Sequence, residues 1–253
     1  MNKIFSATLL AATLAFSAHH AAADDMVSES RPVDARAVKV NLDGIISLTV
    51  KQGPVATLTL YGEKRYLQKV TVTQIGDQLR IDSDVHGFHI GKTDLRAELT
   101  LPALHEMVSG GVGATDINGF SGDDLRLALE GAGAVKVHVH YKNLTAKLGG
   151  VGSMTIDAGD SDNVNLDMRG AGQIEIAGHS KSLHAKLGGV GSLDAQELHA
   201  DEVNVDMTGL GSATVYAKNS AVLKLSGLGS ATVYGKPANR VASARGMGSV
   251  SWQ

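Results

Sequence analysis

Apolar and polar residues alternate along most of this chain, in short runs separated by turns. Leu144, Ala146 and Leu148 are each separated by a polar residue, and residues 164–168 and 183–187 repeat the pattern. A period of two places successive side chains on opposite faces of a β-strand, so one face of each strand is expected to be buried. A helix would need about 10–12 residues with a period of 3.6, which no repeat contains. The pattern predicts an all-β protein.

Eight Gly-x-Gly triplets interrupt these strands at nearly constant spacing. Their first glycines are 20, 19, 20, 19, 20, 18 and 19 residues apart. Glycine adopts positive φ without steric cost and lets two backbones approach closely, so each triplet is interpreted as a tight structural turn. The residue between the glycines is always apolar and is expected to point inward. The predicted turn glycines are Gly111, Gly113, Gly131, Gly133, Gly150, Gly152, Gly170, Gly172, Gly189, Gly191, Gly209, Gly211, Gly227, Gly229, Gly246 and Gly248.

Each repeat consists of a strand, the glycine turn, a second strand and a polar connection. A coil of about 19–20 residues of this kind is typical of a parallel β-helix, and internal repeats of this length indicate a solenoid. The irregular period argues against a left-handed helix built from hexapeptides. Parallel crossovers are generally right-handed. The sequence therefore predicts a single-stranded, right-handed parallel β-helix with an irregular β N-terminal part.

A row of charged residues supports stacking of the coils. The third residue before the first glycine of five successive triplets is Lys147, Asp167, Lys186, Asp206 and Lys224. We call these five residues the charge ladder. Stacked strands lie about 4.8 Å apart, so opposite charges on neighbouring coils attract and a slip by one coil brings like charges together. Exposed pairs contribute only about 0.2–1 kcal/mol each, so the ladder is expected to fix register.

The ends of the chain divide it further. Residues 1–23 have a positive start, an apolar run and an Ala-rich end, the order of a cleavable secretory signal peptide. Residues 24–35 are expected to be a loose leader. Residues 36–253 form a single predicted solenoid domain, with irregular first coils or a cap over 36–108 and the Gly-x-Gly repeats over 109–253. No linker separates these two parts.

Composition narrows the class of partner. The net charge is −3, there is no cysteine, and no basic run is present, so nucleic acid is not an expected partner. No apolar stretch after the signal segment is long enough to span a membrane. Glycine is abundant at 30 residues and aromatic residues make up only 4%, a combination typical of many tight turns around a thin core.

Four segments resemble the GIN-domain family, also described as the head domain of putative autotransporter adhesins. They are residues 42–50, 79–81, 99–102 and 110–113, in the order LDGIISLTV, LRI, LTLP and GGVG. The resemblance covers about residues 36–250. It implies an exported or cell-envelope β-helical protein of bacteria and supplies no catalytic residues.

Histidines are the first candidate for chemistry. His138 and His140 project from the same face of one strand, as two metal ligands would. His179 follows His140 by 39 residues, which places it about 10 Å away, two coils along. That separation is too large for a compact metal site, so surface histidines are the favoured interpretation and no metal or cofactor is predicted. His86 and His89 are interpreted as loop residues.

Two further rows lie on the second strand of the repeats. Asp116, Glu175 and Asp194 share a row with Lys136 and with several threonines, which indicates a solvated mixed face. The alternative is a groove that binds or cleaves polysaccharide. Tyr216 and Tyr234 occupy adjacent coils, either as an exposed aromatic ladder or as a platform on which sugars stack.

These observations favour an exported, non-enzymatic β-solenoid that serves as a binding, adhesion-like or structural module of the cell envelope, in the periplasm or at the cell surface. Its expected partner is an envelope component, a glycan or another protein. The alternative is a polysaccharide-binding or polysaccharide-cleaving β-helix protein.

Overall fold

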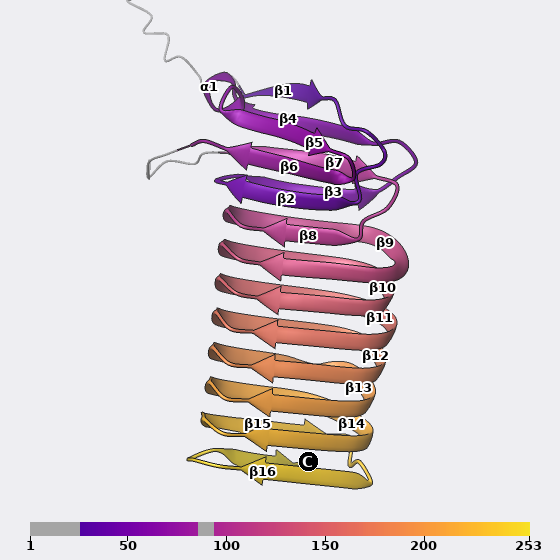
Figure 1. Ribbon diagram of the computed structural model, residues 1–253, viewed down its shortest axis with the longest axis vertical. Helices are drawn as coiled ribbons and strands as arrows, with labels where there is room; N and C mark the ends of the chain where they lie inside the picture. Colours follow the sequence, from indigo (N-terminus) through magenta and orange to yellow (C-terminus); the bar gives the residue numbers. More distant parts are fainter. Residues whose placement is uncertain (1–25, 86–93) are drawn as a thin grey trace, which may run out of the picture.

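The computed structural model describes residues 26–85 and 94–253, and it consists of stacked β-coils (Figure 1). The predicted signal segment and the expected loop residues His86 and His89 lie outside the described residues. The N-terminal part contains a helix α1 (Lys64–Leu67) and the strands β1 (Met26–Arg31), β2 (Lys39–Gly44), β3 (Ser47–Gln52), β4 (Thr57–Glu63), β5 (Val70–Ile75), β6 (Gln78–Ser83), β7 (Arg96–Leu101) and β8 (Glu106–Ser109).

The repeats form long strands that bend around each coil. They are β9 (Val112–Leu129), β10 (Ala132–Leu148), β11 (Val151–Met168), β12 (Ala171–Leu187), β13 (Val190–Met207), β14 (Leu210–Leu225), β15 (Leu228–Tyr234), β16 (Asn239–Ala244) and β17 (Ser249–Trp252). From β9 to β15 each strand pairs in parallel with the next, and β16 and β17 pair in parallel with β14 and β15. This stacking confirms the expected all-β parallel solenoid.

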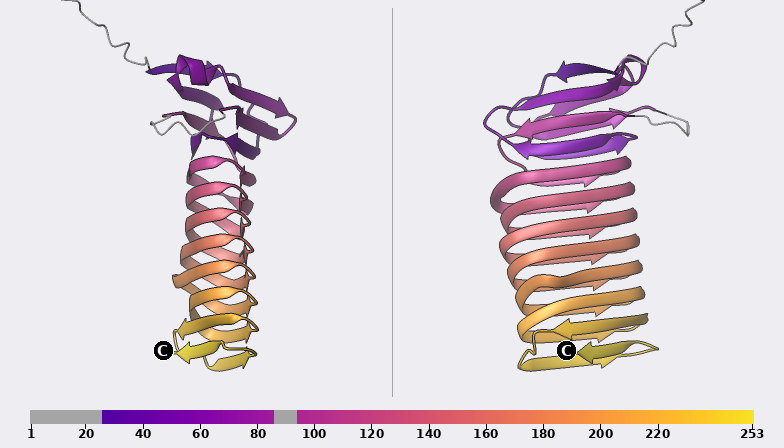
Figure 2. Two further views of the ribbon diagram at one scale, coloured as in Figure 1. Left: turned by 90° about the vertical axis from the view of Figure 1, so that its left-hand side faces the viewer. Right: turned by 180° about the vertical axis from the view of Figure 1, so that it is seen from behind.

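The repeat part is narrow in one side view and broad in the other (Figure 2), so each coil is flattened, with two broad faces and two narrow edges. The Gly-x-Gly triplets form one narrow edge, which we call the glycine edge. The turn between the two halves of each coil, at residues 157–163 and their equivalents, forms the opposite edge, which we call the polar edge. The inward rows are almost completely buried: Met154, Ile174 and Leu193 come from one face, and Leu166, Ala185 and Val205 from the other. Their alternation with exposed residues is the pattern from which the strands were predicted.

The N-terminal part both starts the solenoid and covers its end. β2 lies in parallel between β6 and β8, and β3 lies in parallel between β7 and β9, so β2 and β3 form a first coil. β4 pairs antiparallel with β7, and β5 with β6, which ends the parallel stack. An antiparallel cap of this kind shields the end of a core that would otherwise be exposed to water.

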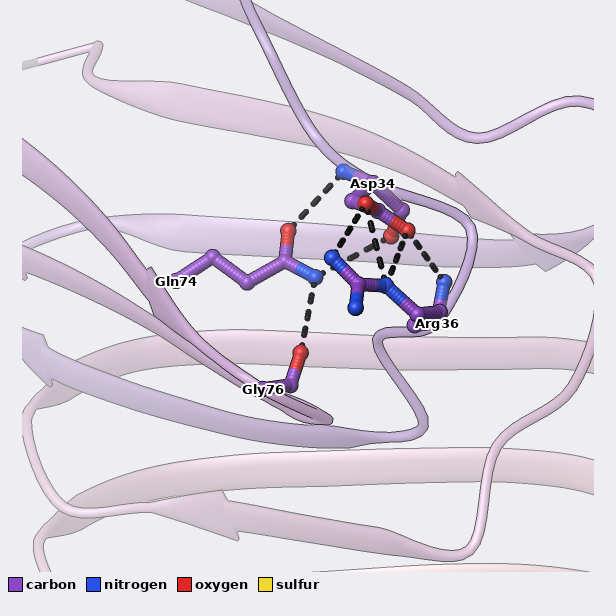
Figure 3. Close-up of polar contacts among 4 residues, drawn as sticks. All are labelled: Asp34, Arg36, Gln74 and Gly76. Atoms are coloured by element: carbon purple, nitrogen blue, oxygen red, sulfur yellow. Dashed lines mark hydrogen bonds and ion pairs between the residues drawn. The ribbon is translucent and has the colours of Figure 1, made fainter.

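The expected loose leader is largely ordered, which corrects the prediction for residues 26–35. β1 pairs antiparallel with β4 over its whole length. The backbone N–H of Asp34 donates to Gln74 Oε1 at 2.9 Å, and Gln74 Nε2 donates to the carbonyls of Asp34 and Gly76 at 3.2 Å. The Asp34 carboxylate also accepts hydrogen bonds from Arg36 (Figure 3), which lower the pKa of Asp34. The sequence pattern did not predict this strand because its side chains are exposed. Its order comes from backbone pairing with β4.

The far end of the stack is closed by different means. Register places Arg240 and Trp252 of the last coil over the inward positions Ala221 and Val233. The Arg240 guanidinium lies 5.5 Å from the centre of the Trp252 ring. An inward-pointing charge on a terminal strand hinders pairing with a further strand, so this pair both covers the core and protects the open edge.

Within the described residues no helix is long and apolar enough to cross a membrane.

Candidate functional site

The glycine edge is built by close contact between successive backbones. A Cβ atom added to Gly150 would lie 1.9 Å from the Gly131 carbonyl oxygen, and one added to Gly170 would lie 1.9 Å from that of Gly150. The second glycines are equally close, with 1.8 Å for Gly172 against Gly152. Backbone hydrogen bonds continue around this corner, for example from Val151 N–H to the Gly131 carbonyl at 2.9 Å. The predicted turn glycines therefore lie in two stacked columns; no side chain fits along most of their length, and the contacts loosen to 3.0 Å at Gly246 and Gly248.

The residue between the glycines points outward, which corrects the expectation that it joins the core. Val151 is 61% exposed, Val190 56% and Leu210 47%. Because Leu148 and Met154 both point inward, alternation assigns the inward positions between them to Gly150 and Gly152, and the outward position to Val151. The outward residues form an apolar ridge along the glycine edge, and they are Val112, Ala132, Val151, Ala171, Val190, Leu210, Leu228 and Met247.

The charge ladder runs beside this ridge. Its five members occupy successive register positions, with Lys147 opposite Asp167, Asp167 opposite Lys186, and so on to Lys224. Within residues 26–85 and 94–253, however, no ion pair joins two of its members. Lys147 pairs with Glu130 at 3.3 Å and Asp167 with Arg169 at 3.0 Å. In this described part of the chain Lys186, Asp206 and Lys224 have no ion-pair partner.

The polar edge carries a second alternating row that the sequence analysis missed. Lys142 pairs with Asp123 at 2.6 Å, Lys181 with Asp162 at 2.6 Å, and Lys218 with Asp201 at 3.7 Å. The hydrogen bond with Asp123 raises the pKa of Lys142 and lowers that of Asp123. We call these six residues the acid–base column. They are 19, 20, 19, 20 and 17 residues apart in the sequence, a spacing almost as regular as that of the charge ladder.

Rings stack next to the acid–base column. The His199 and Tyr216 rings lie 4.3 Å apart and nearly parallel, at 14°. His179 meets His199 edge-on, with centroids 5.6 Å apart, and its Nδ1 lies 3.4 Å from Asp160 Oδ1. Tyr234 is one register position beyond Tyr216. Since one face of His199 lies against one face of Tyr216, those two faces cannot stack on a sugar, whereas the ring edges, with their N–H and O–H groups, are open to a ligand.

These side chains line two adjoining concavities that share His199 and Tyr216. The first has a volume of about 530 Å³ and lies against the acid–base column, where Lys142, Lys181 and Lys218 reach it. The second has a volume of about 460 Å³ and continues past Tyr234 to Gln253. Together we call them the polar-edge groove.

The remaining candidate residues are spread over the surface. His138 and His140 are exposed on either side of buried Val139, and His138 Nδ1 lies 3.5 Å from Asp157 Oδ2. Among the described residues, no three His, Cys, Asp or Glu side chains come together in a way that could hold a metal ion. Glu175 and Asp194 are register neighbours, but both are exposed and neither lines the groove. Asp116 is separated from them by Lys136 and Thr155.

Fold and edges together define a capped parallel β-solenoid with a solvent-exposed groove. More particularly, the chain belongs to the family described as "Putative auto-transporter adhesin, head GIN domain", which matches residues 38–237. The resemblance to the GIN-domain family is thereby confirmed. A search of curated proteins gave no match.

Solved structures share the fold. One is a putative adhesin from Parabacteroides distasonis ATCC 8503, with a TM-score of 0.84 and 19% identity, covering 91% of this chain and 98% of that one. Another, from the same organism, is described as a putative lipid binding protein, with a TM-score of 0.80, 18% identity and coverage of 90% and 97%. A putative adhesin from Parabacteroides merdae ATCC 43184 has a TM-score of 0.79, 19% identity and coverage of 90% and 96%. At these identities the likeness establishes the fold alone.

Proposed function

We propose that the protein is an exported, non-enzymatic binding module of the bacterial cell envelope, in the periplasm or at the cell surface, and that the polar-edge groove holds a glycan of little net charge. The family description points to adhesion, and the sequence of residues 1–23 supports export. The observation that carries the glycan assignment is the composition of the groove, which combines ring edges, hydroxyls and internally neutralised charges.

Charge balance selects among ligands. The first concavity is lined by the cations Lys142, Lys181 and Lys218 and by an equal number of carboxylates, from Asp160, Asp162 and Asp201. Each of these lysines already pairs with an aspartate of the acid–base column. A phosphate-rich or strongly acidic polymer would need unpaired cations, whereas a neutral sugar needs donors and acceptors.

The ring edges and hydroxyls of the groove can form hydrogen bonds with the hydroxyl groups of a glycan. His179, His199 and Tyr216 present N–H and O–H groups. Ser161 and Ser180 line the same concavity, but their hydroxyls already donate to the backbone carbonyls of Tyr141 and Ser182. The groove crosses successive coils, so it offers similar groups at regular intervals along the solenoid. A chain of repeating sugars presents hydroxyls with comparable regularity.

The non-enzymatic assignment rests on the position of the carboxylates. A glycosidase needs two carboxyl groups that flank the scissile bond within a cleft. In the first concavity, Asp162 and Asp201 are held in ion pairs by Lys181 and Lys218, and Asp160 lies 3.4 Å from His179 Nδ1. Glu175 and Asp194 are neighbours but lie on an open face, away from the groove.

Glycan-array screening of the purified protein, followed by calorimetry on the best hit, tests this function. We expect His199→Ala to weaken binding at least tenfold, about 1.4 kcal/mol, and His184→Ala, an exposed histidine on a broad face, to leave it unchanged. A blank array, or equal binding by both variants, would refute the groove assignment. New reducing ends in the bound glycan would refute the non-enzymatic assignment.

A further inference from the structure

The apolar ridge is the feature of the molecule that its own fold does not use. Eight outward residues follow one another along the glycine edge, and the larger ones are about half exposed or more. Scattered exposed apolar residues are common on proteins, but a contiguous row marks an interaction surface. The glycines beneath the ridge fix its backbone, so the row is rigid and its spacing constant.

We propose that the apolar ridge packs against the ridge of a second copy of this chain, in an antiparallel dimer. This interface lies on the edge opposite the polar-edge groove, so the proposal is independent of the glycan assignment. Its first support is the two-coil period of the ridge. Val112, Ala132, Val151, Ala171 and Val190 alternate between large and small side chains. Over these five coils the ridge is complementary to itself when shifted by one coil, whereas its last three residues, Leu210, Leu228 and Met247, are all large.

The charge ladder has the same period and the same phase. Coils that carry Val151 and Val190 in the ridge carry Lys147 and Lys186 in the ladder, whereas the coil of Ala171 carries Asp167. At the centre of the ridge, a shift by one coil therefore places Ala171 against Val190 and Asp167 against Lys186 at once. Two independent rows that require the same alignment favour a partner with this same surface.

Symmetry determines the direction of the pairing. A two-fold axis across the glycine edge, perpendicular to the solenoid, keeps both ladders on the same side of the contact and reverses one chain. With eight triplets in full overlap, the first coil meets the eighth and the fourth meets the fifth, so an odd coil always faces an even one. Asp167 then faces Lys186 of the second copy, and Lys147 faces Asp206.

In-chain contacts leave the ladder available for this role. Within the described residues, Lys186, Asp206 and Lys224 have no ion-pair partner, although the three lysines of the acid–base column are all paired. Eight coils about 4.8 Å apart give a contact about 34 Å long.

Sedimentation equilibrium on the purified protein tests the dimer. We expect a reversible dimer that Val190→Glu converts to monomer, whereas Thr145→Glu, on an exposed broad-face position, leaves the dimer intact. Circular dichroism of both variants checks that the fold is retained. A wild-type protein that is monomeric over the whole accessible concentration range would overturn the proposal. Monomers that bind neutral phospholipid vesicles through the ridge would overturn it too, and would assign the ridge to a lipid surface.

Charge exchange gives the sharper test. Asp167→Lys alone faces Lys186 of its copy, and Lys186→Asp alone faces Asp167, so each variant is expected to dimerise at least tenfold more weakly than wild type. When the two variants are mixed, each lysine meets an aspartate and a heterodimer of near wild-type affinity is expected. An effect confined to stacking within one chain would not recover on mixing, and that outcome would overturn the antiparallel register.

Discussion

The chain turns at both narrow edges of the solenoid, but different groups hold the turns together at each edge. At the glycine edge the backbones touch, no side chain fits inside, and Lys186, Asp206 and Lys224 have no ion-pair partner among the described residues. At the polar edge the turns vary in length, and side chains make the contacts. There the acid–base column pairs coil to coil, and Tyr141 donates a hydrogen bond to the Leu104 carbonyl at 2.5 Å.

The stacking register of the coils and the binding of partners therefore depend on different groups. A backbone column fixes the stacking of coils without using side-chain chemistry, so the side chains above it are free for a partner. The polar edge uses most of its charges internally and keeps ring edges and hydroxyls for a small, neutral ligand. One edge is thus suited to a protein surface and the other to a glycan.

The largest expected effect comes from adding one methyl group to the backbone column. Gly150→Ala places a Cβ 1.9 Å from the Gly131 carbonyl oxygen, and we expect it to destabilise the fold by roughly 4 kcal/mol or more. The neighbouring Gly149→Ala meets nothing closer than Lys147 Cε at 3.7 Å and should change stability by less than about 0.5 kcal/mol. Urea unfolding of both variants measures the contrast, and equal stabilities would show that close approach does not govern this edge.

A smaller effect is expected from the buried tyrosine of the polar edge. Tyr141→Phe removes the hydrogen bond to Leu104 and should cost about 1–3 kcal/mol near neutral pH. Burial raises the pKa of Tyr141 to about 12, above its unfolded value near 10. The neutral form therefore stabilises the fold fully below pH 10, and this contribution is lost as the pH rises from 10 through 12.

Thermal unfolding of wild type and Tyr141→Phe across that range isolates the tyrosine. The wild type should lose stability between pH 10 and 12 more steeply than the variant, because other alkaline transitions are common to both. Parallel pH profiles would contradict a buried, neutral Tyr141.

The smallest effects distinguish paired from unpaired lysines. Lys181→Ala removes an exposed ion pair with Asp162 and should destabilise the monomer by about 0.2–1 kcal/mol. Lys186→Ala removes no ion pair among the residues that the structure describes, so we expect no measurable change in monomer stability but weaker dimerisation. Chemical unfolding of the monomer and sedimentation of the dimer separate the two, and a reversed pattern would contradict the division of roles between the edges.

Much of the fold was predictable because the repeats carry three periodic signals at once: glycines, alternating inward residues and charges. The outward direction of Val151 was also readable, by counting alternate positions from Leu148 through two glycines, but its apolar character suggested the core. An apolar residue need not be buried within its own chain, because a partner molecule can cover it instead. The order of residues 26–31 could not be read, because an exposed strand held by backbone pairing leaves little trace in side-chain pattern.

The candidate site was only partly predictable. Tyr216 and Tyr234 were placed correctly on adjacent coils, but no spacing rule shows that His199 covers a face of Tyr216. That contact depends on how the turns of unequal length align, since the register shifts between Ala195 and His199. The acid–base column was readable from its regular spacing and was overlooked because it lies within the variable turns.

The chain contains no cysteine, so single introduced thiols give the most direct test of the use of the glycine edge. In the antiparallel dimer Ala171 of one copy faces Val190 of the other. Under mild oxidation, a mixture of Ala171→Cys and Val190→Cys proteins should form a disulfide-linked heterodimer faster than either variant cross-links with itself. Faster self-cross-linking of each variant, or no cross-linking at all, would contradict the antiparallel ridge-to-ridge contact.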